Sequence, residues 1–311
     1  MCLHPDVASL PKKRMLQKIR QLLELIRFSH TLFALPFALL AAMMAWRLTP
    51  FRWNDFAGIL LCMATARSFA MSFNRVADRH LDAKNPRTAG RHLPAGVLSV
   101  HIVLLFAGAN AMGFVVGTLL FLPNRLPVVL AVPVLAFLVG YSFAKRFTAL
   151  SHFWLGTALA LSPVAAWVAI RGQAVLTNPP DLLPALVLGG AVLTWVAGFD
   201  IIYACQDYDA DRNAKLHSIP VSRGISGALR LAALCHLLTI LLLAGLPLVY
   251  PLFGWMYWAG ILAVAVLLVY EHWLVRPDDL SRVNAAFFNV NAVISLGLFA
   301  IGSLDLLVGA R

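Results

Sequence analysis

Residues 182–211 read LLPALVLGGAVLTWVAGFDIIYACQDYDAD and join a long apolar run to a cluster of acids. The run from residue 182 to residue 204 is long enough to cross a membrane, because a spanning helix needs about 20 apolar residues. Asp200, Asp207, Asp209 and Asp211 lie at its end. A carboxylate is costly inside a bilayer, so acids in this position indicate a functional site. The stretch therefore predicts a membrane helix that ends at a polar site.

The composition of the whole chain agrees with this stretch. Of its 311 residues, 60% are hydrophobic and 13% are charged, and the mean hydropathy is +0.80. A soluble domain usually has about 25% charged residues. The four cysteines lack the spacing of a metal site, and we interpret them as small core residues. Lipid is therefore the expected solvent for most of the chain.

Continuous apolar runs predict the number of membrane helices. Because these runs show no alternation of inward and outward residues, they exclude a β-barrel. We expect an all-α, multi-pass membrane protein with a bundle of about nine transmembrane helices. Residues 28–311 form one transmembrane domain in this interpretation, and residues 1–27 form a basic, amphipathic lead-in on the membrane surface or a plain positively charged anchor. The nine runs cover about 28–47, 56–75, 98–121, 126–144, 152–171, 182–204, 227–249, 254–274 and 284–308.

The basic residues predict the orientation. The net charge is +11, and 19 of the 25 Lys and Arg residues fall on one side if the N-terminus is inside, against five on the other side. Arg67 lies within the second run. Cytoplasmic loops are enriched in Lys and Arg, so we expect a protein of the plasma (inner) membrane with its N-terminus and acidic loops in the cytoplasm. This distribution favours a lipid bilayer as the partner and argues against nucleic acid.

Six of the 14 acidic residues fall in two short windows on that inner side. In the first window, Asn74, Asp78 and Asp82 are spaced four residues apart, which places them on one helix face. In the second window, Asp200, Tyr203, Asp207 and Asp211 stack in the same way, whereas Asp209 points elsewhere. These windows predict two stripes of polar side chains, one on each of two helices at the same depth.

Stacked carboxylates repel each other, so two such stripes call for a cation. Hard oxygen ligands select ions such as Mg²⁺, which typically takes one or two carboxylates and completes its shell with water and phosphate oxygens. We therefore expect Mg²⁺ ions that hold a diphosphate between the stripes. Two alternatives remain: solvated helix ends with ordinary ion pairs to arginine, or an ion-coupled transporter.

These residues also resemble the UbiA superfamily of intramembrane prenyltransferases. The resemblance rests on ordered blocks between about residues 20 and 230. They read NRVADRHLD at 74–82, NPRTAGRHLPAG at 85–96, YSFAKRFT at 141–148, DIIYACQDYDAD at 200–211 and HSIP at 217–220. Many members of the superfamily have an aspartate after the motif asparagine, where this chain has Arg75. That departure leaves one possible Mg²⁺ ligand in doubt.

The resemblance implies a helical bundle around a central cavity that opens to lipid. It also implies transfer of a polyprenyl chain from its diphosphate to an aromatic acceptor. In this interpretation the acceptor carboxylate is bound by Arg67. The remaining implied roles are metal binding by Asp78, Asp82, Asp207 and Asp211, and diphosphate binding by Asn74, Lys145 and Arg27.

The expected chemistry is electrophilic aromatic substitution, with Mg²⁺ and basic groups stabilising the departing pyrophosphate. Tyr203 is a candidate for shielding the allylic cation with its ring. Asp200 is a candidate base for the acceptor or a support for the metal shell. The leading acceptor is a 4-hydroxybenzoate-like acid of quinone biosynthesis, and a dihydroxynaphthoate of menaquinone biosynthesis is the main alternative.

Overall fold

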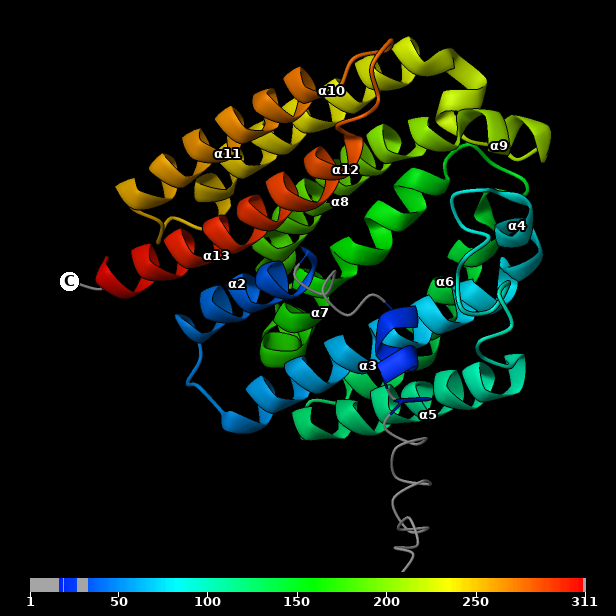
Figure 1. Cartoon of the computed structure of the whole chain (residues 1–311). Helices are drawn as coiled ribbons and strands as arrows, with labels where there is room; N and C mark the ends of the chain where they lie inside the picture. Colours follow the sequence, from blue (N-terminus) through cyan, green and yellow to red (C-terminus); the bar gives the residue numbers. More distant parts are fainter. Residues whose placement is uncertain (1–16, 19, 27–32, 310–311) are drawn as a thin grey trace, which may run out of the picture.

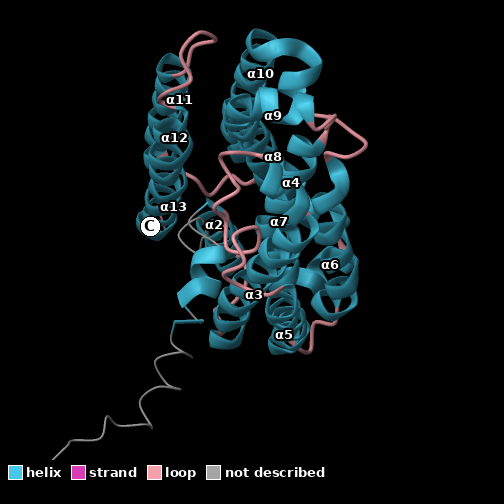
Figure 2. Ribbon diagram, turned by 45° about the vertical axis from the view of Figure 1, so that its right-hand side comes forward, coloured by secondary structure: helices cyan, strands magenta, loops and turns pink. Residues whose placement is uncertain are grey.

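The structure is a computed structural model that describes residues 17–18, 20–26 and 33–309. Its described residues form helices and connecting loops without a β-strand (Figures 1 and 2). The helices are α2 (Leu35–Trp46), α3 (Trp53–Ala77), α4 (Arg79–Lys84), α5 (Val100–Thr118), η2 (Leu119–Phe121), α6 (Leu126–Ala144), α7 (Ser151–Thr177), η3 (Pro179–Leu182), α8 (Leu183–Ala204), η4 (Cys205–Asp207), α9 (Tyr208–Asn213), α10 (Ile219–Val249), α11 (Trp255–Leu274), α12 (Val283–Ala285), η5 (Ala286–Val290) and α13 (Asn291–Val308).

Eight helical segments in the described part of the chain are long and apolar enough to cross a membrane, which confirms an integral membrane protein. They match the second to ninth predicted runs. The first run is different, because its described helix α2 has 12 residues and rises only about 18 Å. A bilayer core is about 30 Å thick. The beginning of that run, and Arg27 with it, lies outside the described residues.

Helix α10 begins at Ile219, well before its predicted start at about residue 227. The hydroxyl of Ser218 accepts a hydrogen bond from the Val221 amide, and Pro220 stands in the first turn. Both features favour a helix start. Gly224, with a φ of +70°, then kinks the helix. Hydropathy missed this first segment because Ser222 and Arg223 interrupt the apolar run.

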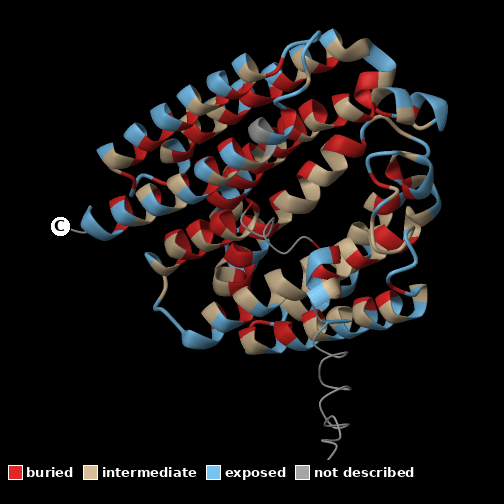
Figure 3. Cartoon of the chain, in the orientation of Figure 1, coloured by how far each residue is buried: buried red, intermediate tan, exposed pale blue. Residues whose placement is uncertain are grey.

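Helix α8 lies at the centre of the bundle between α7 and α10, and its residues are mostly buried (Figure 3). Small residues allow this close packing. A Cβ atom built on Gly156 of α7 would lie 2.5 Å from the carbonyl oxygen of Leu193 on α8. Outward-facing residues on peripheral helices are apolar and exposed, as in Leu105, Val129 and Leu262. The fold thus has a tightly packed centre and an apolar outer surface suited to lipid.

The described part of the lead-in packs against the bundle. Residues 20–25 are helical, and Leu25 and Ile26 are buried against Val76 and Val103. Leu23 of the same segment is exposed. The amphipathic pattern that predicted a surface helix therefore serves, in these last residues, to attach the lead-in to α3 and α5.

Candidate active site

A cavity of about 810 Å³ lies beside the ends of α3 and α8, where the short helices α4 and α9 begin. Helices α4 and α9 lie close together at one end of the molecule in both ribbon views (Figures 1 and 2). Its lining combines polar and charged side chains with apolar ones, among them Phe33, Leu155, Leu159 and Phe199. The cavity can therefore accept a molecule that has both a charged and an apolar group.

The first acidic stripe borders this cavity. Helix α3 ends at Ala77, and Asp78 joins it to α4 with non-helical dihedral angles. Amide hydrogen bonds from Asp78 to the Asn74 carbonyl (2.9 Å) and from Asp82 to the Asp78 carbonyl (2.8 Å) nevertheless maintain the helical stacking. The Asn74 amide group also donates to the Asp78 carboxylate at 3.0 Å. Asn74, Asp78 and Asp82 thus share one wall of the cavity.

The second stripe forms the opposite part of the lining. Asp200 and Tyr203 lie in the last turns of α8, Asp207 ends η4, and Asp211 lies in α9. All four side chains line the cavity, and Asp207 and Asp211 are buried. Asp209 is exposed and contributes to the rim.

Each of the four aspartates predicted to bind metal forms an ion pair with a basic side chain. The distances are those of direct ion pairs, and three are short enough for hydrogen bonds. The pairs are Asp78 with Arg146 (3.1 Å), Asp82 with Arg91 (2.7 Å), Asp207 with Arg87 (2.5 Å) and Asp211 with Lys145 (3.6 Å).

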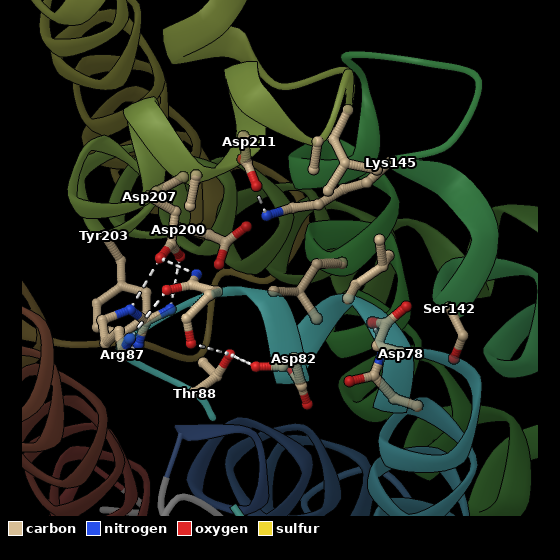
Figure 4. Close-up of a pocket in the computed structure, with 18 of the residues that line it drawn as sticks. Asp78, Asp82, Arg87, Thr88, Ser142, Lys145, Asp200, Tyr203, Asp207 and Asp211 are labelled. Atoms are coloured by element: carbon tan, nitrogen blue, oxygen red, sulfur yellow. Dashed lines mark hydrogen bonds and ion pairs between the residues drawn. The ribbon is translucent and has the colours of Figure 1, made fainter. Parts of the chain in front are cut away.

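Arg87 makes the most extensive of these interactions (Figure 4). Its Nε and Nη2 atoms donate to the two oxygens of Asp207 at 2.9 and 2.5 Å, and its Nη1 donates to the Tyr203 hydroxyl at 2.7 Å. The Asn85 amide group donates to the same carboxylate at 2.9 Å. Asp207 therefore has its oxygens occupied by the loop that follows α4.

Sequence reasoning assigned no role to Arg87, Arg91 or Arg146. The first two lie in the block NPRTAGRHLPAG, which contributed to the resemblance but has no helical spacing relative to either stripe. Arg87 and Asp207 are 120 residues apart. Only the folded loop brings them together, so local spacing contained no signal for this pairing.

Asp200 has a histidine as its partner. Its Oδ2 atom lies 2.7 Å from Nδ1 of His152, which is fully buried in the first turn of α7. His152 also was not predicted from the sequence. A lone histidine in an apolar run carries no spacing signal, and its carboxylate partner is 48 residues away.

Two predicted basic residues also line the cavity: Arg67 of α3 and Lys145 at the end of α6. Burial by itself lowers the pKa of Lys145, but the surrounding carboxylates, Asp211 first, outweigh it and raise the pKa. Arg75 also lines the cavity, with its guanidinium 4.0 Å from Asp82. Arg27 lies outside the described residues.

The donor set of the two stripes fits a hard divalent cation. Asp82 Oδ2 and Asp211 Oδ2 are buried and accept no hydrogen bond, and their basic partners lie 4.0 and 3.6 Å away, so each stripe has a carboxylate oxygen that a ligand can use. In this conformation no group of three His, Cys, Asp or Glu residues within the described residues could hold a metal ion. Mg²⁺ often takes only one or two carboxylates and obtains its other ligands from water and phosphate. The stripes therefore suit Mg²⁺ that arrives with a diphosphate.

Comparisons with known proteins agree with this geometry. The model of the UbiA prenyltransferase family matches residues 34–293. A 4-hydroxybenzoate octaprenyltransferase of Aliivibrio salmonicida is 30% identical over 244 residues, covering 78% of this chain and 81% of that protein. One from Aeromonas salmonicida is 34% identical over 241 residues, covering 75% and 78%.

Solved structures give the same result for the fold. The apo structure of a UbiA homolog from Aeropyrum pernix has a TM-score of 0.80 at 30% identity, covering 89% of this chain and 98% of that one. A UbiA homolog from Archaeoglobus fulgidus bound to DMAPP and Mg²⁺ has a TM-score of 0.64 at 19% identity, covering 93% and 99%. The transporter alternative is therefore set aside: this chain belongs to the UbiA prenyltransferase family and is a membrane-embedded prenyltransferase.

Proposed function

We propose that this protein transfers a polyprenyl chain from polyprenyl diphosphate to an aromatic carboxylic acid of the 4-hydroxybenzoate type, with Mg²⁺, in quinone biosynthesis. The observation that carries this proposal is the pairing of each of four cavity-lining aspartates with an arginine or lysine. Such a site can exchange its internal ion pairs for the negative charge of a diphosphate and the positive charge of metal ions. The relatives named as 4-hydroxybenzoate octaprenyltransferases support the choice of acceptor.

In the diphosphate half of the site, Asp78, Asp82, Asp207 and Asp211 hold Mg²⁺. When bound, Mg²⁺ neutralises the diphosphate and makes pyrophosphate a better leaving group. Lys145 and Asn74 contact the diphosphate oxygens, and Arg27 is proposed to do so from the lead-in. Arg87, Arg91 and Arg146 move from their carboxylates to the phosphates, where charge-assisted hydrogen bonds stabilise the charge that develops as the bond breaks.

In the acceptor half of the site, Arg67 binds the carboxylate of the aromatic acid. The Tyr203 ring stabilises the allylic cation, and its contact with a cation in this structure supports that role, because the Arg87 guanidinium lies 5.0 Å from the ring centroid. Tyr203→Leu is expected to lower turnover about 10-fold and to change the KM for prenyl diphosphate less. Equal effects on turnover and on the KM for prenyl diphosphate would contradict this role. Tyr203→Phe keeps the aromatic ring and is the control for loss of the hydroxyl alone.

A direct test uses purified membranes with a polyprenyl diphosphate and a panel of acceptors that includes 4-hydroxybenzoate and a dihydroxynaphthoate. The expected result is prenylated 4-hydroxybenzoate and stoichiometric pyrophosphate, both abolished by chelation of Mg²⁺. A product with the naphthoate alone would select the menaquinone pathway, and no product with any aromatic acid would refute the proposal.

Asp211→Asn should lower activity on the order of 100-fold. Asp209→Asn, at the exposed rim, is the matched control and should remain active.

A further inference from the structure

Asp200 differs from the four metal-binding candidates in the kind of partner it has. Those four pair with arginine or lysine, whereas the carboxylate of Asp200 lies 2.7 Å from Nδ1 of His152. The side chain of His152 is 0% exposed and that of Asp200 is 19% exposed. Asp200 lines the cavity, together with the other labelled carboxylates in Figure 4. The histidine therefore holds the carboxylate from behind, on the side away from a bound substrate.

The surroundings of His152 determine which of its nitrogens carries the proton. Its Nε2 atom accepts a long hydrogen bond, 3.5 Å, from the backbone amide of Ile219 at the start of α10. An amide can only donate, so Nε2 must be unprotonated. In the neutral ring the hydrogen is then on Nδ1, which donates to Asp200 Oδ2 at 2.7 Å. The start of α10 thus fixes the tautomer that Asp200 requires.

We propose that His152 is the positioning residue for Asp200, and that Asp200 is the proton acceptor for the aromatic substrate; this rests on the proposed function. The bond from His152 occupies Oδ2 and leaves Oδ1 for the cavity. Asp200 lines the cavity, so an aromatic substrate that binds there can approach this carboxylate.

In the proposed reaction, the C–O bond between the prenyl C1 carbon and the diphosphate breaks, and its electron pair leaves with pyrophosphate. A ring carbon of the acceptor forms the new C–C bond with an electron pair of the ring. The hydrogen on that carbon then leaves as a proton to Asp200 Oδ1, and the electron pair of the C–H bond restores aromaticity. His152 keeps its Nδ1 hydrogen throughout and moves no proton.

The test compares His152→Ala, His152→Asn and Asp200→Asn, each assayed with 4-hydroxybenzoate and a polyprenyl diphosphate. Asparagine at 152 can present an N–H donor in place of Nδ1. We expect His152→Ala to lower kcat by about 10- to 100-fold with an unchanged KM for the diphosphate, and His152→Asn to recover part of the loss. Adding His152→Ala to Asp200→Asn should have little further effect, because the two residues act as a unit.

His236→Ala is the matched control for loss of a buried histidine. His236 joins α8 to α11 through the Trp195 carbonyl and His272, and it does not line the cavity. This control should lower thermal stability and leave kcat of the folded enzyme unchanged. The inference is overturned if His152→Ala keeps the wild-type kcat, if His152→Asn gives no recovery, or if the double variant shows additive losses. Product formation by the wild type tests the proposed function separately, so the two failures can be distinguished.

Discussion

At the scale of single residues, Arg67 gives the most specific prediction about how the aromatic substrate is recognised. It lies in α3, seven residues and about two helical turns before Asn74, and lines the same cavity. A guanidinium can hold a carboxylate with two parallel hydrogen bonds, whereas an ammonium cannot. We therefore expect Arg67→Lys to raise the KM for the aromatic acid about 10-fold, equivalent to about 1.4 kcal/mol, with little change in the KM for the diphosphate.

Steady-state kinetics with each substrate varied in turn would measure this difference. Lys145→Gln is the complementary variant, since Lys145 pairs with Asp211 in the diphosphate half, and it should weaken diphosphate binding instead. If both variants affect the two substrates to the same extent, the division of the cavity into two halves is wrong.

Spacing in the sequence is enough to predict residues that share a helix face, and not enough to predict their partners. Asn74, Asp78 and Asp82 line one cavity wall because i, i+4 and i+8 positions stack on a helix. Arg87 and His152 reach their carboxylates across 120 and 48 residues respectively. Such long-range contacts depend on how the helices pack, which local periodicity does not encode.

At the scale of elements, the loop between α4 and α5 connects the two stripes. Arg87 binds Asp207 and Arg91 binds Asp82, so this one loop contacts both sides of the cavity. Removing Arg87 leaves Asp207 buried without its strongest partner, which is destabilising unless a cation replaces it. We expect Arg87→Gln to lower the unfolding temperature without metal and to increase the stabilisation by Mg²⁺ alone, because the cation then takes the place of the guanidinium beside Asp207.

Thermal unfolding in detergent, with and without Mg²⁺, measures both effects. Arg79→Gln is the control, because Arg79 donates to the Val76 carbonyl and does not line the cavity. An equal response of the two variants to Mg²⁺ would contradict a specific role for the Arg87–Asp207 pair.

The contact between α7 and α8 gives a prediction for stability. A Cβ atom at Gly156 would approach the Leu193 carbonyl to 2.5 Å, and backbone cannot move aside as a side chain can. Gly156→Val is expected to destabilise the protein by about 1–3 kcal/mol, in the range of other overpacked cores. Gly108→Val is the matched control, because nothing lies within 4 Å of a Cβ atom there. Unchanged thermal stability of Gly156→Val would show that the two helices can separate without cost.

At the scale of the whole molecule, the number of membrane crossings determines on which side of the membrane each terminus lies. Eight described segments are long enough to cross, and the first predicted run adds a ninth crossing in our proposal. An odd number places the two termini on opposite sides. An alkaline phosphatase fused after Arg311 should therefore be active, and one inserted at Gly90 in the basic loop should be inactive. Activity at both positions, or only at Gly90, would overturn the proposed orientation.

The sequence alone determined that this is an all-helical membrane protein and where most of its long helices lie, because apolar runs and their lengths reflect the thickness of the bilayer directly. It also placed two stripes of acids at helix ends, since that arrangement depends only on local helical geometry. The tertiary structure decided which basic side chain meets each acid, how the loop after α4 joins the two stripes, and that His152 supports Asp200. Those outcomes arise from the packing of α7, α8 and α10 and from a loop without periodicity, where contacts between distant residues set the geometry.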